Sequence, residues 1–191
     1  MPEQFEIELR GKPITAAFPG GFYIEDPDRV GGIRIMSAQA VTPGDLATVA
    51  GQTTLDGGER VLQATTVSTQ PGSPANISGA LSLGNRSLGG GGFFWNQNGE
   101  NCGQQGITDA FGLNNIGLLV RTWGRIVERD PSWFKIDDGS GVNVKCLVPS
   151  GVTIDPGWTY VGVTGISSCE MVGAELHSLL RVRGQSDLVG Y

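Results

Sequence analysis

The sequence has very little of what catalytic and metal sites are built from. Its 191 residues include one histidine, His177, and three cysteines, with no Cys-x-x-Cys pair. A Ser-His-Asp triad needs a histidine base and a zinc site needs clustered ligands, so both have few candidates. A Gly-x-Ser-x-Gly elbow and a phosphate-binding loop are also absent. We therefore predict a protein that is not an enzyme and holds no cofactor and no metal ion.

Positive charge and long apolar runs are scarce as well. The chain has 13 Lys and Arg against 19 Asp and Glu, a formal net charge of −6. Because nucleic-acid affinity rests largely on basic side chains, nucleic acid is not an expected partner. No run of 18 apolar residues is present, so we expect no membrane insertion. The start of the chain lacks a signal peptide's pattern, which leaves a mature secreted form or a protein not exported by that route.

What the sequence does contain is an internal repeat. Phe22–Asp26 (FYIED) recurs as Phe134–Asp138 (FKIDD) at an offset of 112 residues. Val49–Thr54 matches Val163–Ser168 at an offset of 114, and two further matches lie in the same order along the chain. Collinear matches of this kind indicate two copies of one structural unit.

Each copy has the pattern of short strands. Phe22 and Ile24 alternate with polar residues, as do Phe134 and Ile136, and this is the period of a half-buried strand. The turn after the second pair is rich in glycine, which tight hairpins favour. No long amphipathic helix is visible. We predict an all-β fold with domains at residues 1–68 and 117–191, joined by a glycine-rich connector over 69–116.

Several of these segments resemble oligonucleotide/oligosaccharide-binding (OB) barrels, in particular the tandem OB repeats of bacterial secreted and cell-surface proteins. The strand-like runs that carry the resemblance are Leu118–Arg125, Phe134–Gly141 and Val161–Ile166. The stretch Leu83–Gly90 is similar to the connector of those repeats. The resemblance implies two tandem five-stranded OB-type barrels and an extracellular or cell-surface location. Its usual helix has no counterpart, since the links Met36–Asp45 and Pro149–Trp158 are short and contain proline.

The resemblance also implies a disulfide. Cys146 follows the third strand of the second copy and Cys169 follows the fourth, and these two strand ends lie together in an OB barrel. A Cys146–Cys169 bridge would indicate an oxidising compartment. Cys102 is then a free thiol or a link to another chain. The alternative is three buried, reduced thiols.

OB barrels bind ligands in a groove with aromatic platforms. The candidate groove residues are Tyr23, Trp133, Lys135, Trp158 and Tyr160. Their aromatic rings would stack on a carbohydrate or contact a peptide, with single-stranded nucleic acid as the weaker option. The alternative is that these residues form solvated strand faces and contacts between the two barrels.

The connector is rich in polar residues and glycine, yet it contains aromatic side chains that are costly to leave in water. These are Phe93, Phe94, Trp95 and Phe111. They would pack on the barrels or against neighbouring copies. Asn76 and Asn85 in the same segment are formal N-glycosylation acceptors.

Taken together, these patterns predict an extracellular, non-enzymatic structural protein. Its partners would be other copies of itself, joined head-to-tail in a filament or surface layer. The N-terminal strand Phe5–Leu9 would form the first strand of its own barrel rather than add to a neighbour's sheet. A carbohydrate- or peptide-binding module is the main alternative. A hydrolase that uses His177 and Asp138 is a distant third.

Overall fold

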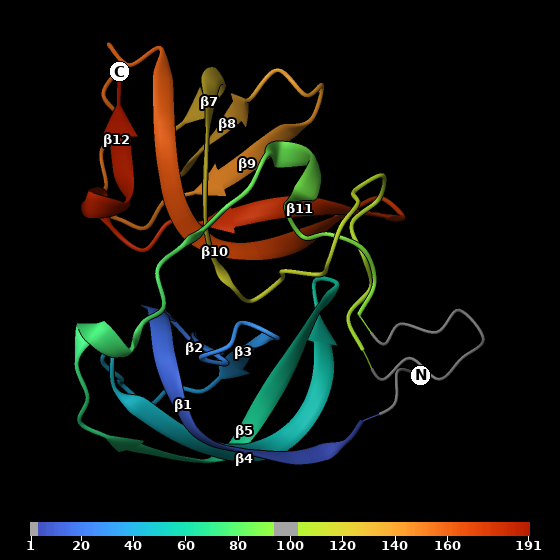
Figure 1. The fold of residues 1–191 in the computed structure, drawn as a ribbon, viewed down its shortest axis with the longest axis vertical. Helices are drawn as coiled ribbons and strands as arrows, with labels where there is room; N and C mark the ends of the chain where they lie inside the picture. The colour runs from blue at the N-terminus through green and yellow to red at the C-terminus, as the bar shows by residue number, and fades with distance from the viewer. Residues whose placement is uncertain (1–3, 94–102) are drawn as a thin grey trace.

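The computed structural model describes residues 4–93 and 103–191, and these residues form strands with no α-helix. Two sheets, of five and seven strands, are stacked one above the other (Figure 1). The predicted all-β fold is therefore confirmed. No helix among the described residues is long and apolar enough to cross a membrane.

The first sheet closes on itself in the order β1-β2-β3-β5-β4, with β4 paired back to β1. Its strands are β1 (Glu6–Phe18), β2 (Gly21–Glu25), β3 (Gly32–Met36), β4 (Leu46–Asp56) and β5 (Glu59–Gln70). The N-terminal residues Glu6–Leu9 pair with β4 of the same sheet, as predicted. The enclosed side chains form a core of Ile14, Phe22, Ile24, Ile35, Ala47, Val49 and Leu62.

The second sheet has the order β12-β10-β11-β9-β8-β7-β6, and β10 also pairs with β7. Its strands are β6 (Leu81–Ser82), β7 (Leu119–Asp130), β8 (Trp133–Asp137), β9 (Asn143–Leu147), β10 (Tyr160–Val172), β11 (Glu175–Arg181) and β12 (Leu188–Gly190). Three short 3-10 turns complete the described elements: η1 (Pro74–Asn76), η2 (Asn85–Ser87) and η3 (Gln185–Asp187). Strands β7, β8, β9, β11 and β10 thus repeat the closed order of the first sheet.

The second sheet has two strands beyond this shared order, β12 and β6, and they have different origins. β5 pairs with β4 along its whole length, whereas β11 pairs only with the second half of β10 and β12 pairs with Val161–Val163 in its first half. β11 and β12 together therefore pair with β10 in two pieces, as β5 pairs with β4 in one. β6 comes from the connector and pairs with β7 at Val120–Arg121.

The internal repeat is visible in the strand register. Ile14 pairs with Ile24 and Ile126 pairs with Ile136, and a bulge follows immediately on β1 and on β7. The alternating residues of both motifs are buried, as the sequence pattern predicts. The links after β3 and β9 contain no helix, which agrees with their proline content.

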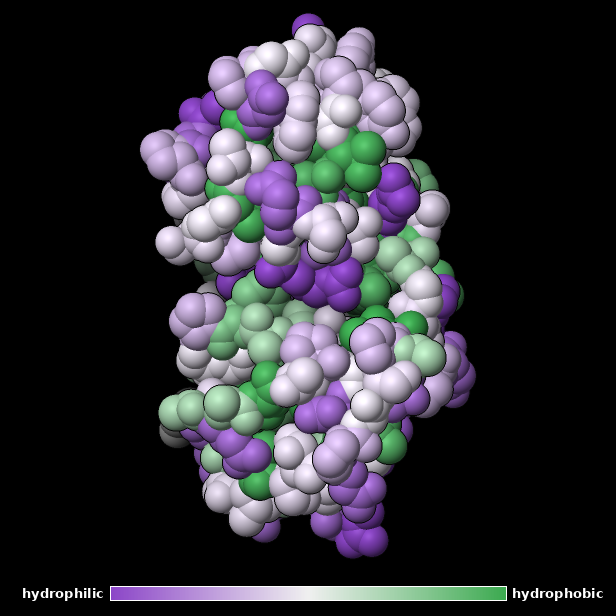
Figure 2. Space-filling model, turned by 90° about the vertical axis from the view of Figure 1, so that its left-hand side faces the viewer, coloured by the Kyte–Doolittle hydropathy of each residue, from purple (hydrophilic) through white to green (hydrophobic). Residues whose placement is uncertain are grey.

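The two sheets pack directly on each other. Tyr23 and Ala16 of the first sheet form one buried cluster with Leu119 and Ile166 of the second. The backbones meet at Gly32, where a Cβ atom would lie 2.4 Å from the carbonyl oxygen of Gly117. On the side that Figure 2 shows, hydrophilic side chains cross the level where the sheets meet, and hydrophobic groups gather in small patches above and below.

Candidate functional site

The cysteine prediction needs correction, because Cys146 and Cys169 are free thiols. Both are buried, but Cys146 lies in the core of the second sheet and Cys169 packs outside it, with Ile107, Ile116 and Leu176. β11 separates their two strands, so the bridge cannot form without moving the sheet. Burial raises the pKa of the Cys169 thiol to about 12 and raises that of Cys146 too, which keeps both protonated. Cys102 lies outside the described residues.

Tyr23, one of the five predicted groove residues, is not on a free surface. It points away from the core of its own sheet, but the second sheet covers it completely, and its exposed fraction is 0%. Its hydroxyl donates a hydrogen bond of 3.2 Å to Oε2 of Glu59. Burial raises the pKa of Tyr23 well above its usual range. Tyr23 is therefore a contact between the two sheets and not a ligand platform.

Trp133 and Lys135 lie on an outer face of β8, where lysines cover the indole ring. The Nζ atoms of Lys135 and Lys145 lie 5.3 Å and 5.5 Å from the ring centroid. Lys135 also pairs with Glu128 at 2.6 Å. This arrangement agrees with the alternative of a solvated strand face, in which cation–π contacts hold the ring.

The remaining groove candidates lie near the end of the second sheet. Trp158 is half-buried against the glycine of β12, since a Cβ atom on Gly190 would lie 1.9 Å from its ring. Tyr160 is 41% exposed, and beside it stands Trp123, which is 58% exposed. Their ring centroids are 5.7 Å apart and the ring planes are inclined by 50°. Burial alternates along β7, and Trp123 lies on its exposed face between the buried Thr122 and Gly124. The alternation of the strand is therefore the sequence signal that predicts an exposed Trp123.

Trp123 and Tyr160 border a groove of about 690 Å³, which we call the aromatic groove. Gly162 is the cross-strand partner of Trp123, so bare backbone forms the floor beside the indole. Polar groups surround the rings, and the further lining residues are Ser82, Leu83, Gly84, Arg121, Thr122, Asp138 and Tyr191. Although burial opposes it, hydrogen bonds from Ser140 and from the backbone N–H of Asn85 lower the pKa of Asp138. The groove therefore combines apolar rings with an ionised carboxylate.

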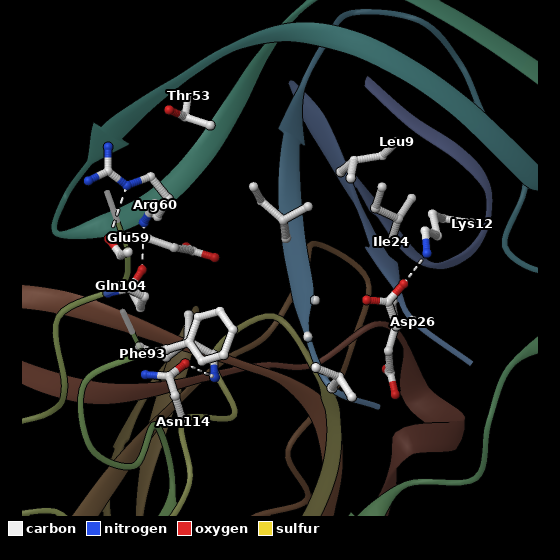
Figure 3. Close-up of a pocket in the computed structure, with 17 residues that line it drawn as sticks. Leu9, Lys12, Ile24, Asp26, Thr53, Glu59, Arg60, Phe93, Gln104 and Asn114 are labelled. Carbon is white, nitrogen blue, oxygen red and sulfur yellow. Dashed lines mark hydrogen bonds and ion pairs between the residues drawn. The ribbon is translucent and has the colours of Figure 1, made fainter. Parts of the chain in front are cut away.

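A second cavity, of about 330 Å³, opens at the mouth of the first sheet (Figure 3). We call it the first-sheet cavity. Lys12 and Asp26 form an ion pair on one side, and Arg60 with Gln104 stands on the other. The apolar part of the lining comprises Leu9, Ile24, Val30, Ile33, Phe93 and Ile116.

Two buried carboxylates also line the first-sheet cavity. Glu25 is 2% exposed and Glu59 is 1% exposed, and Oε1 of each has no hydrogen-bond partner. Oε2 of Glu25 accepts the N–H of Leu119 at 2.9 Å, and Oε2 of Glu59 accepts the hydroxyl of Ser168 at 2.8 Å. Burial raises the pKa of both carboxyl groups. Both Oε1 atoms are shielded from solvent, and Nε of Arg29 lies 4.0 Å from that of Glu25.

The connector aromatics that the structure describes are partly exposed. Phe93 forms an isolated β-bridge with Gln104. The guanidinium of Arg86 lies over the ring of Phe111, 5.2 Å from the ring centroid. Phe94 and Trp95 lie outside the described residues.

His177 is half-exposed and lies 3.4 Å from Glu175, away from both Asp138 and the two cavities. Within residues 4–93 and 103–191, His, Cys, Asp and Glu form no group that could hold a metal ion.

Comparison with known proteins gave no match: no protein-family model, no curated protein and no solved structure is significantly similar to this chain.

Proposed function

We propose that this chain is a non-enzymatic, extracellular structural protein that joins copies of itself head-to-tail in a filament or surface layer. One observation carries the proposal. In the second sheet, β6 covers the edge of β7 at Val120–Arg121. The equivalent residues of β1, Ile7–Glu8, pair with β4 on one side and with no described strand on the other.

The proposal takes both closed sheets to be OB-type barrels. Their shared order, in which the first strand pairs with the second and with the fourth, and the fifth lies between the third and fourth, supports this. The resemblance of the strand motifs and of Leu83–Gly90 to tandem OB repeats supports it as well.

An open strand edge favours association, because its unpaired N–H and C=O groups are a template for another strand. A strand from a different surface of the next copy would make a heterologous contact, and such contacts build filaments when they do not close into a ring. The packed junction between the sheets would hold both barrels in one orientation, so that every added copy repeats the same geometry.

Electron microscopy and hydrogen exchange on the native protein test this proposal together. We expect long polymers, in which the amides of Glu6–Leu9 exchange more slowly than in dispersed protein. The amides of Ile166–Val172, already paired with β11, serve as the internal control and should not change. Dispersed particles under all conditions would refute self-association, and polymers without protection of Glu6–Leu9 would refute the strand-edge contact.

Carbohydrate binding in the aromatic groove is the second candidate function. Trp123 and Tyr160 offer exposed rings to the apolar face of a sugar, and Arg121 and Asp138 offer partners to its hydroxyl groups. We expect Trp123→Ala to abolish binding in an oligosaccharide screen. Trp133→Ala, which removes a ring covered by lysines, is the matched control and should leave binding unchanged. Absence of binding by the unmodified protein would dismiss this candidate.

A further inference from the structure

The connector fills the mouth of the second sheet with the segment Leu81–Leu88, which we call the plug. At its centre, the side-chain amide of Asn85 donates hydrogen bonds to the carbonyl oxygens of Ile136 at 3.0 Å and Val142 at 2.9 Å. Its Oδ1 accepts a hydrogen bond of 3.1 Å from the hydroxyl of Thr122. Asn85 is thereby bonded to β7, to β8 and to the residue that precedes β9.

The rest of the plug is fixed just as closely. The N–H of Asn85 donates to Oδ2 of Asp138 at 2.7 Å, and the N–H of Leu83 donates to the carbonyl of Arg121 at 2.9 Å. Leu88 is 1% exposed and belongs to the core of the second sheet. The plug therefore contributes the strand β6, the hydrogen bonds of Asn85 and a core leucine to the second sheet.

The strand register shows where such a plug would lie in the first sheet. Leu9 pairs with Val49 as Thr122 pairs with Val163, so Leu9 stands in the place of Thr122. By the FYIED and FKIDD motifs, Ile24 stands for Ile136 and Asp26 for Asp138. Gly32 pairs with Glu25 as Asn143 pairs with Asp137, so Gly31 stands for Val142. All four of these first-sheet residues line the first-sheet cavity.

The cavity thus lies where the second sheet holds its plug. Its apolar walls at Leu9, Ile24 and Ile33 suit a leucine side chain. The edge of β1 at Ile7–Glu8, which no described strand covers, lies beside it, as the edge of β7 lies beside the plug.

We propose that the first-sheet cavity is a docking slot for a peptide segment of a partner chain with the chemistry of the plug: a short strand, an asparagine and a following leucine. The strand pairs with the edge of β1, the asparagine amide donates to the carbonyl of Ile24, and the leucine enters the apolar part of the cavity. The inference deepens the proposed function and rests on it only for the source of the segment, which is another chain.

One substitution between the two sites makes the slot testable. Leu9 provides no hydroxyl where Thr122 donates to Asn85, so the slot lacks one hydrogen bond that the second sheet makes. Leu9→Thr restores that donor. A hydrogen bond of this kind would tighten binding roughly two- to tenfold.

The experiment titrates the full chain into a fluorescein-labelled synthetic peptide of residues 80–89 and follows fluorescence anisotropy. We expect saturable binding, tighter binding to Leu9→Thr, and weaker binding of a peptide with Asn85→Ala. The Leu9→Thr comparison separates the slot from exchange at the second sheet, because Leu9 touches only the former. No saturable binding, or equal binding in all three cases, would overturn the proposal.

The outcome is independent of polymer formation. Peptide binding by a protein that forms no polymers would keep the slot and reject self-association. Polymers formed by a protein that does not bind the peptide would keep self-association and reject the slot.

Discussion

The hydroxyl of Ser168 donates a hydrogen bond of 2.8 Å to Oε2 of Glu59, and so joins the second sheet to the first through one buried carboxylate. Tyr23 donates to the same oxygen, and Arg34 Nε lies 3.6 Å away from it. This group of polar side chains is surrounded by apolar contacts between the sheets. The junction is therefore specified by hydrogen bonds as well as by apolar area.

Replacing Ser168 with alanine should weaken this junction. Loss of this hydrogen bond to a buried carboxyl group costs about 1–3 kcal/mol of the free energy of unfolding. For a chain of this length, that lowers Tm by roughly 2–12 °C. Calorimetry measures the effect. Ser132→Ala removes the hydroxyl of an exposed hydrogen bond to Asp130, and should change Tm very little.

The backbone contact at Gly32 predicts an intolerance of any side chain. A Cβ atom there would lie 2.4 Å from the oxygen of Gly117, and Gly117 itself has a φ of +91°, which disfavours a replacement on that side. Gly32→Ala should cost about 1–3 kcal/mol by forcing the sheets apart. Gly184→Ala, with nothing within 4 Å of its Cβ position, is the control. Equal denaturation midpoints for the two variants would contradict the contact.

Glu25 should make stability depend on pH. Burial raises the pKa of its carboxyl above the ordinary value of 4.5, so ionisation opposes folding. The folded state then loses stability as the pH rises from 4.5 through the raised pKa. Glu25→Gln removes this loss while its amide oxygen still accepts the N–H of Leu119.

The stability of Glu25→Gln relative to the unmodified protein should therefore increase between pH 4.5 and neutral pH, and should be constant below pH 4.5. Urea unfolding at several pH values measures it. A difference that does not change with pH would show that Glu25 is ionised without penalty. Glu59 is present in both proteins, so its own titration cancels in the comparison.

The two buried thiols predict slow chemical modification. Cys146 and Cys169 are reduced and enclosed, so a thiol reagent should not reach them in the native protein. At most one thiol per chain should react before denaturation, and two more after it. Addition of a reductant should leave Tm unchanged, and a fall in Tm would show that a disulfide holds the fold.

The sequence predicts the parts of the fold that depend on local pattern. Alternation at Phe22–Ile24 and Phe134–Ile136 places these residues in two cores, and the spacing of the repeat gives two equivalent closed sheets. What it cannot predict is how the two units meet. Tyr23 faces outward from its own sheet, as the alternation requires, and becomes buried only because the second sheet packs over it.

The errors at the site have the same origin. Cys146 and Cys169 lie near strand ends, but the face on which each side chain lies decides whether they meet, and β11 stands between them. Trp123 lies within a strand-like run, but that run alone does not show that its ring meets Tyr160 of the neighbouring strand. The correspondence between the plug and the first-sheet cavity requires strand pairing, since Leu9 and Thr122 are chemically unlike.

The separation of Glu59 and Ser168 by 109 residues also bears on the order of events during synthesis. The first sheet is complete once Gln70 has left the ribosome, and domains generally fold as they emerge. Tyr23, Glu25 and Glu59 then face water until β7 and β10 are made. The carboxyl groups of Glu25 and Glu59 keep this temporary surface hydrated. The surface becomes buried only after the last third of the protein has been synthesised.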